Sequence, residues 1–216
     1  MSNKASSAAD QQGSLTITFF QSNGDDPSET TRRAPLSKEI IKAYFLGALH
    51  DGTFSSNGRF RISQKGAEWL KLLQGLLRKI GYNSWIYKEG KDREVYVLET
   101  LADFLDFKFD PERLRYKEEK IAYIRGFFDA EGGIPREGNS RFYIQLAQNN
   151  KQKLMKLKRL LTELGINTGK IHNPSRKVDP NYWRMYVLTD SQELFVKKIG
   201  SWHPRKIRIL SERMKI

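Results

Sequence analysis

Cysteine is absent from this 216-residue chain, and histidine occurs only three times. Without thiols there can be no disulfide scaffold, thiolate zinc site, iron–sulfur cluster or cysteine nucleophile. The three histidines leave little room for a histidine-based metal site. No run of about 18 apolar residues occurs, which argues against a transmembrane helix, and the polar N-terminus lacks the pattern of a secretory signal. We therefore expect a soluble intracellular protein, in the cytoplasm or in an organelle matrix.

Basic residues are what the chain has in excess: 38 Lys and Arg against 25 Asp and Glu, a formal net charge of +13. Hydrophobic residues make up 38% and aromatic residues 12%, which is enough for a folded core. A folded, strongly basic chain is expected to bind a polyanion, nucleic acid before a membrane surface.

The first 36 residues hold three basic and four acidic side chains, so the basic excess belongs to residues 37–216. These first residues are rich in Ser, Ala, Gln and turn formers, apart from Leu15–Phe20, whose composition is that of a strand. We expect a flexible leader with one short strand. The alternative is an arm that adds backbone contacts to a nucleic acid.

The rest of the chain contains an internal repeat. The segment 43–47 (Ala-Tyr-Phe-Leu-Gly) recurs at 122–126 as Ala-Tyr-Ile-Arg-Gly, 79 positions later. Three further matches follow in the same order, with offsets that grow to 82, 84 and 90 positions. Ordered matches with a growing offset are typical of a duplicated unit whose second copy has acquired small loop insertions.

Each copy is predicted to have the order αββαββα, with an antiparallel sheet of four strands. The fold class is therefore α+β, with two pseudo-twofold half-domains at 37–108 and 118–216 joined by a linker at 109–117. The bounds of the expected helices and strands follow from the spacing of apolar residues and from segments of strand-like composition. In the first copy these are a helix at 38–51, strands ending at 59–65, strands at 84–88 and 94–99, and a closing helix at 101–107. In the second they are a helix at 118–130, strands at 141–148, 169–172 and 183–188, a closing helix at 191–199, and a basic helix from 204.

The first helix of each copy is expected to pack against its counterpart. Both are apolar on most sides, which favours burial, and the small residues Gly47 and Gly126 would let the two backbones approach closely. Each helix ends in an acid followed by glycine, Asp51 in the first copy and Glu131 in the second. Two carboxylates this close, at the negative ends of two helix dipoles, are unfavourable unless a cation binds between them. Hard divalent cations prefer such oxygen ligands.

These residues resemble a known family. Ile124–Gly132 (IRGFFDAEG) resembles the second motif of a single-chain LAGLIDADG homing endonuclease, and Phe45–Gly52 (FLGALHDG) resembles the first. The resemblance covers roughly residues 37–216, including the order of elements. In the first motif Asp51 lies one position closer to the shared glycine than Glu131 does in the second. His50 is the alternative ligand there, although imidazole suits Mg²⁺ poorly.

The resemblance implies two saddle-shaped sheets laid along the major groove of double-stranded DNA, and hydrolysis of both strands across the minor groove. It implies Mg²⁺ held by Asp51 and Glu131, with Gly52 and Ala130 contributing beside them, and with Mn²⁺ or Ca²⁺ able to substitute in binding. We expect the target to be long and imperfectly palindromic, and the enzyme to be a monomer encoded within an intron or intein.

Family members also place a glutamine or lysine near the metals, at the end of the second strand. In this sequence Gln64 and Gln148 occupy that position and are expected to organise water. The basic residue that some members carry after the fourth strand is not evident, and Lys65 is a candidate to replace it.

The sheet faces are expected to contact DNA. Because alternate residues of a strand share a face, Phe60 and Ile62 point towards the helices and leave the residues between them on the other side. Arg, Gln and Asn side chains there match guanine and adenine edges in the major groove. The candidate DNA contacts are Asn57, Arg59, Arg61, Ser63, Lys65, Lys88, Arg93, Asn139, Arg141, Tyr143, Gln145, Lys170, His172 and Arg184.

Two other functions share this sequence pattern. An RNA-binding intron maturase of the same fold could use the same basic surface for folded RNA. A DNA-binding protein that no longer cleaves is the third reading, against which the intact acids of both motifs argue. We expect the endonuclease.

Overall fold

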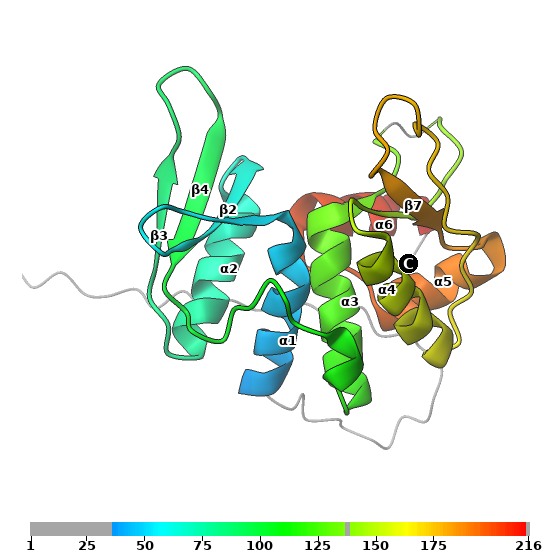
Figure 1. The fold of residues 1–216 in the computed structure, drawn as a ribbon, viewed down its shortest axis with the longest axis horizontal. Helices are drawn as coiled ribbons and strands as arrows, with labels where there is room; N and C mark the ends of the chain where they lie inside the picture. The colour runs from blue at the N-terminus through cyan, green and yellow to red at the C-terminus, as the bar shows by residue number, and fades with distance from the viewer. Residues whose placement is uncertain (1–35, 137–138, 215–216) are drawn as a thin grey trace, which may run out of the picture.

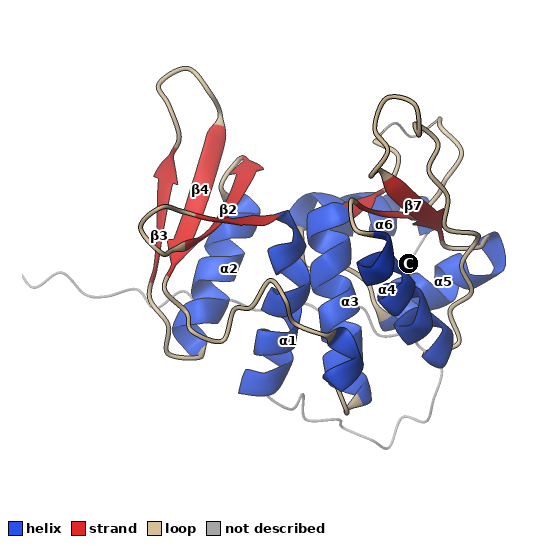
Figure 2. Cartoon of the chain, in the orientation of Figure 1, coloured by secondary structure: helices blue, strands red, loops and turns tan. Residues whose placement is uncertain are grey.

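The computed structural model describes residues 36–136 and 139–214. The expected leader strand at 15–20 lies outside the described residues. Two halves, each with an antiparallel sheet, lie on either side of a central pair of helices (Figure 1). The helices lie on one side of the two sheets (Figure 2). In the part of the chain that is described, no helix is long and apolar enough to cross a membrane.

The central pair consists of α1 (Lys38–Ala48) and α3 (Lys117–Glu131), as the repeat predicted. Helix α1 begins at Ser37, whose hydroxyl accepts a hydrogen bond from the amide of Ile40 at 3.3 Å. A Cβ atom placed on Gly47 would lie 2.0 Å from the carbonyl oxygen of Tyr123, and one on Gly126 would lie 1.9 Å from that of Tyr44. Since neither distance is tolerated, only glycine fits at the two crossing points.

The N-terminal half has the predicted four-stranded sheet. Its strands are β1 (Gly52–Phe54), β2 (Phe60–Lys65), β3 (Ser84–Lys88) and β4 (Val95–Thr100), in the order β1-β2-β4-β3. Helix α2 (Glu68–Lys79) packs its apolar stripe against the core, and Gly81 follows it at a φ of +90°. This left-handed backbone at the helix end is the conformation that favours glycine.

The closing helix expected at 101–107 is wrong, because this segment consists of turns. The amide of Leu105 bonds to the carbonyl of Ala102 at 3.3 Å, and the Asp106 carboxylate accepts from the amide of Lys108 at 2.8 Å. Aspartate side chains that bond to nearby amides compete with helix formation.

The C-terminal half has a smaller sheet than predicted. Its strands are β5 (Gly132–Gly133), β6 (Gln145–Gln148) and β7 (Trp183–Tyr186), in the order β5-β6-β7. Residues 141–144 are not in a strand. The fourth strand expected at 169–172 is reduced to isolated bridges, Thr168 with Val187 and His172 with Arg184. A turn-rich segment with prolines at 174 and 180 follows and ends the pairing.

The helices of this half are close to those expected. They are α4 (Lys151–Glu163), α5 (Thr189–Lys198) and α6 (Pro204–Met214). The leucine stripe of α4 is buried in the second of two hydrophobic cores, one in each half. The described residues also form two short 3₁₀ helices, η1 (Leu49–Asp51) after α1 and η2 (Pro111–Arg113) in the linker.

Candidate functional site

The two motif acids lie where α1 and α3 end beside the sheets. Asp51 is the last residue of η1, Glu131 is the last residue of α3, and the glycine after each begins a strand. Burial and the nearby negative charge of Asp51 together raise the pKa of Glu131 to about 7. Burial also raises the pKa of Asp51, to about 6. The two carboxyl groups therefore interact across the interface between α1 and α3, which we call the seam.

The shorter first motif is explained by the winding of the chain. Asp51 follows Gly47 by four residues, and three of them lie in the 3₁₀ helix η1. Glu131 follows Gly126 by five residues of α-helix. A 3₁₀ helix rises about 2.0 Å per residue and an α-helix about 1.5 Å, so both segments advance about 7.5 Å. The tighter winding compensates for the missing residue.

The two glutamines of the site differ in what they contact. The Nε2 of Gln64 donates a hydrogen bond to the Oδ2 of Asp51 at 2.8 Å. Gln148 is buried, its Nε2 lies 3.3 Å from the Nδ1 of His50, and its Oε1 accepts from the amide of Asn149. Only the first glutamine touches a motif acid.

His50 is engaged at both ring nitrogens. Its Nε2 lies 2.7 Å from the hydroxyl of Tyr123, opposite the contact with Gln148. Burial, with the nearby charge of Lys153, lowers the pKa of His50 to about 3, so the ring is neutral. His50 thus bridges α3 and β6, and Asp51 is the acidic group that the first motif offers.

A basic residue beside the acids was missed from the sequence. Lys206 of α6 is buried, and its Nζ donates to the carbonyl oxygens of Phe128, Asp129 (3.0 Å) and Gly132 (2.7 Å). Its charge lowers the pKa of both Asp51 and Glu131. Lysine in an amphipathic basic helix is usually solvent-exposed, so the sequence carries no signal that would single it out. The candidate named in its place, Lys65, is exposed at the end of β2.

Asp129 is the third acid near the seam, and it is part of the core. Its carboxylate accepts from the hydroxyl of Tyr44 (2.7 Å), the amide of Trp202 (2.9 Å) and the hydroxyl of Ser201. Buried carboxylates are retained where donors satisfy them in this way. Asp129 therefore ties α3 to α1 and to the segment before α6.

The outer face of the N-terminal sheet carries the predicted arginines together with an unpredicted acid. Thr53, Arg61, Glu99 and Trp85 are direct cross-strand neighbours and form one row across the sheet. Arg59 lies on the same face, and Asn57, Ser63, Lys65 and Arg93 are exposed. Lys88 instead shares the face of Ile86 and pairs with Glu94 at 2.5 Å.

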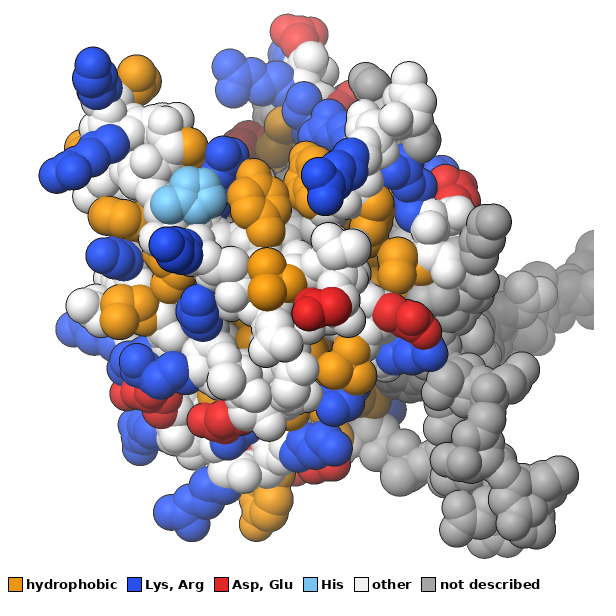
Figure 3. All heavy atoms as spheres, turned by 90° about the vertical axis from the view of Figure 1, so that its right-hand side faces the viewer, with side chains coloured by type: hydrophobic (Ala, Val, Ile, Leu, Met, Phe, Trp, Pro, Cys, Tyr) orange, Lys and Arg blue, Asp and Glu red, His pale blue; other side chains and the backbone are white. Residues whose placement is uncertain are grey.

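On the outer face of the C-terminal sheet, no acid among the described residues pairs with the predicted DNA contacts as Glu99 pairs with arginines in the other half. Arg184 is the cross-strand neighbour of Ala147, and its Nε lies 3.3 Å from the Nε2 of His172. Gln145 donates to the hydroxyl of Tyr182 at 3.0 Å. The other predicted contacts of this half are all exposed: Asn139, Arg141, Tyr143 and Lys170. Seen from its outer side, this half shows more Lys and Arg side chains than Asp and Glu side chains, spread among apolar and uncharged ones (Figure 3).

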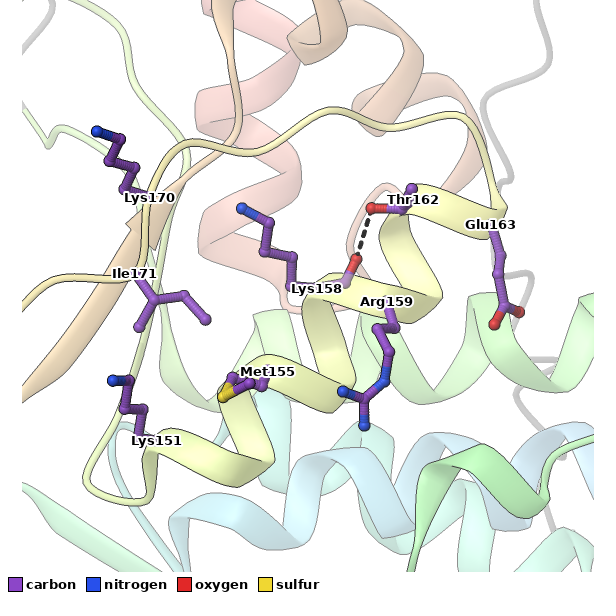
Figure 4. A pocket seen from close by; sticks show the side chains of 8 residues that line it. All are labelled: Lys151, Met155, Lys158, Arg159, Thr162, Glu163, Lys170 and Ile171. Carbon is purple, nitrogen blue, oxygen red and sulfur yellow. Dashed lines mark hydrogen bonds between the residues drawn. The ribbon is translucent and has the colours of Figure 1, made fainter.

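Two cavities are lined by residues of this half, and the first of them by residues of the N-terminal half as well. One, of about 330 Å³, is lined by Glu131, Gln148, His50 and Lys153 and so adjoins the seam. The other, of about 790 Å³, lies against α4, where Lys151, Lys158 and Lys170 surround Met155 and Ile171 (Figure 4). The Nζ of Lys158 donates to the carbonyl of Gly169 at 2.9 Å. This second cavity is separate from the motif acids.

Comparison with known proteins finds a family match in the C-terminal half. A family model described as a LAGLIDADG-like domain matches residues 118–200, which include the second motif. Residues 118–200 are therefore similar to a LAGLIDADG-like domain. Among curated proteins, this chain is similar to "Homing endonuclease I-ApeI" of Aeropyrum pernix, with 25% identity over 193 residues that cover 78% of this chain and 85% of the relative.

Solved structures share the LAGLIDADG fold. I-DmoI in complex with DNA and Mn has a TM-score of 0.55 at 23% identity, over 75% of this protein and 97% of that chain. I-DmoI with DNA and Ca has a TM-score of 0.58 at 22% identity, over 81% and 98%. The N-terminal LAGLIDADG domain of DUF199/WhiA has a TM-score of 0.60 at 17% identity, over 78% and 87%. The two-half architecture of this chain is therefore the fold of these solved structures.

Proposed function

We propose that this protein is a site-specific DNA endonuclease that cleaves both strands of a long, imperfectly palindromic target and needs a divalent metal ion. The observation that carries the proposal is the pair of motif acids at the ends of two glycine-packed helices, between two sheets rich in exposed basic and amide side chains. The curated relative is named a homing endonuclease, and I-DmoI was solved with DNA, which supports the same substrate here.

The donor set at the seam fits a hard divalent cation. The carboxylates of Asp51 and Glu131, with the backbone oxygens of Gly52 and Ala130, would hold the ion. Among the residues that the structure describes there is no group of three or more His, Cys, Asp or Glu side chains suited to a metal. Mg²⁺ keeps several waters and takes phosphate oxygens, so two carboxylates suffice for it. When bound, the metal lowers the pKa of water and polarises the phosphate.

The neighbouring residues then have separate tasks. Gln64 holds the carboxylate of Asp51 in place through its amide nitrogen, which leaves its amide oxygen to accept from water. Gln148 acts through His50 and holds η1 against β6, and Lys206 holds the carboxyl end of α3. The predicted face residues of each sheet contact one half of the target, and since the two faces differ, the two half-sites differ as well. One chain contains both halves, 37–108 and 118–216, so a monomer is sufficient.

A cleavage selection tests this function. The full chain is incubated with Mg²⁺ and a DNA library, and cut molecules are sequenced. We expect linear products that share one long site. Asp51→Asn should bring double-strand cleavage of that site below detection while DNA binding survives, because the acid serves the metal and not the DNA. The matched control Asp190→Asn, which changes an exposed acid at the start of α5, should cleave as the parent does.

The outcomes distinguish the three functions that the sequence leaves open. Cleavage by the Asp51→Asn variant would show that the metal site is elsewhere. Selection of one DNA site without any cutting would indicate a non-cleaving DNA-binding protein. Stimulation of intron splicing, with no selected DNA site, would indicate an RNA maturase.

A further inference from the structure

The outer face of the N-terminal sheet contains a charge cluster centred on Glu99. The Oε2 of Glu99 accepts from the Nη1 of Arg59 at 3.0 Å, and its Oε1 accepts from the hydroxyl of Tyr87 at 2.9 Å. The Nε of Arg61 lies 3.2 Å from the same Oε1. One carboxylate therefore holds two arginines on the face that we propose contacts DNA.

Glu99 cannot itself read a base. Its side chain is only 11% exposed, beneath the arginines, and both of its oxygens are occupied. The hydrogen bond from Arg59 lowers the pKa of Glu99, which keeps the group charged at neutral pH. A buried negative charge on a surface that binds a polyanion weakens non-specific binding of DNA. A role in positioning its neighbours would explain why Glu99 is there.

The two arginines are oriented as a pair. Arg59 lies over the ring of Trp85, with its guanidinium carbon 5.3 Å from the ring centre, and uses Nη1 for Glu99. The inner Nε of Arg61 is ion-paired with Glu99 without a hydrogen bond, while its outer Nη2 donates to the exposed Glu89 at 2.9 Å and to the hydroxyl of Tyr87 at 3.2 Å. Residues two apart on a strand are separated by about 6.7 Å. Stacked bases are about 3.4 Å apart along each strand, so this separation matches two base-pair steps.

We propose that Glu99 is a positioning residue that fixes Arg59 and Arg61 for the reading of two guanines, two base pairs apart, in the half-site under the N-terminal sheet. This inference rests on the proposed function. Arginine binds guanine through O6 and N7 with two parallel hydrogen bonds, and a guanidinium held in advance loses less freedom on binding. Glu89 is the partner that Arg61 releases when DNA binds, whereas the pair with Glu99 persists.

The matched control is Glu89→Gln. Like Glu99→Gln, this substitution removes one negative charge from the cluster, but Glu89 does not contact Arg59. Binding selections from a random DNA library would compare the full-length parent with Glu99→Gln and Glu89→Gln, in Ca²⁺ so that bound DNA is recovered. We expect Glu99→Gln to lose about tenfold in preference for guanine at the two positions, the lower range for one bidentate contact. Glu89→Gln should bind all sequences more tightly with an unchanged base preference.

Two further variants complete the test. One examines the other half-site, and the other is used if Glu99→Gln does not fold. Arg184→Lys should change preferences only in the other half-site. If Glu99→Gln does not fold, Arg59→Lys takes its place, because lysine keeps the charge but cannot form the paired bonds. Loss of one guanine preference is then expected.

The failures are distinguishable. A parent that selects no DNA sequence overturns the proposed function, and the inference with it. A parent that selects a site, with the same guanine preference in Glu99→Gln, or in Arg59→Lys where that variant carries the test, overturns the inference alone. A loss of preference spread evenly over both half-sites also overturns it, because a merely destabilised protein would behave in that way.

Discussion

The two halves of this molecule differ in their side-chain contacts far more than in their backbones. In the N-terminal half a glutamine bonds to the motif acid and a buried glutamate holds two arginines. In the C-terminal half the equivalent glutamine is buried against His50, and the sheet has three strands instead of four. The helix seam alone is closely symmetric, with prohibitive Cβ contacts of 2.0 and 1.9 Å at its two glycines. After duplication, backbone contact constrained the seam while each sheet face was free to change.

The largest expected effect tests this symmetry. Gly47→Ala and Gly126→Ala should each destabilise the protein by about 3 kcal/mol or more, because the new methyl group meets backbone that cannot move away. Urea denaturation of each variant measures the loss. Gly169→Ala, whose Cβ would have no neighbour within 3.7 Å, is the control and should stay within about 0.5 kcal/mol of the parent. Unequal effects at 47 and 126 would break the symmetry that the seam shows.

The two glutamines should separate activity from stability. Gln148→Ala removes buried hydrogen bonds and should cost about 1–2 kcal/mol of stability. Gln64→Ala should leave stability within about 0.5 kcal/mol but slow cleavage about 10- to 100-fold, since it releases the carboxylate of Asp51. Thermal melts and single-turnover cleavage of the selected site measure the two effects. If both variants showed the same changes in stability and in cleavage rate, the two glutamines would have the same role in their halves.

The smallest expected effect concerns pH. The raised pKa values of Asp51 and Glu131, about 6 and 7, mean that the folded protein binds more protons than the unfolded chain. The stability they contribute is present below about pH 4 and is lost as pH rises to about 7. Without metal, the Tm of the parent should therefore fall over this range relative to a double variant, Asp51→Asn with Glu131→Gln, by no more than about 4 °C.

Adding a divalent metal should increase the difference in Tm between the parent and the double variant. Since the ion needs both carboxylates deprotonated, the rise in Tm on adding Mg²⁺ should grow between pH 5 and 7.5 in the parent and be absent in the double variant. Titration of Tm against Mg²⁺ at several pH values measures it. A rise that does not depend on pH would place the metal away from these acids.

The sequence was sufficient for elements that depend on local spacing. The motif helices, the leucine stripe of α4 and strand β3 follow from apolar periodicity and from the repeat. The helix expected at 101–107 failed because aspartate side chains bond to nearby amides, a competition that hydrophobic spacing does not reveal. The edge strand at 169–172 failed because its pairing depends on the turn that follows it.

The site was predictable only where the motif itself carries it. Asp51, Glu131 and Gln64 stand at fixed places relative to the repeat. Lys206 is joined to α3 across more than 70 residues of sequence, and such a contact leaves no local pattern. Glu99 could not be recognised either, because an isolated acid on a strand is normally a solvated surface charge, and its burial depends on arginines from a neighbouring strand.

The 3₁₀ turn at the end of α1 has a consequence for how related chains are found. A search pattern that requires a constant number of residues between glycine and acid accepts the second copy and rejects the first. A chain of this kind would then be scored as carrying half a site. Patterns that permit a one-residue gap at this point, matched to a change of helix type, would recover divergent members whose first copy has contracted in the same way.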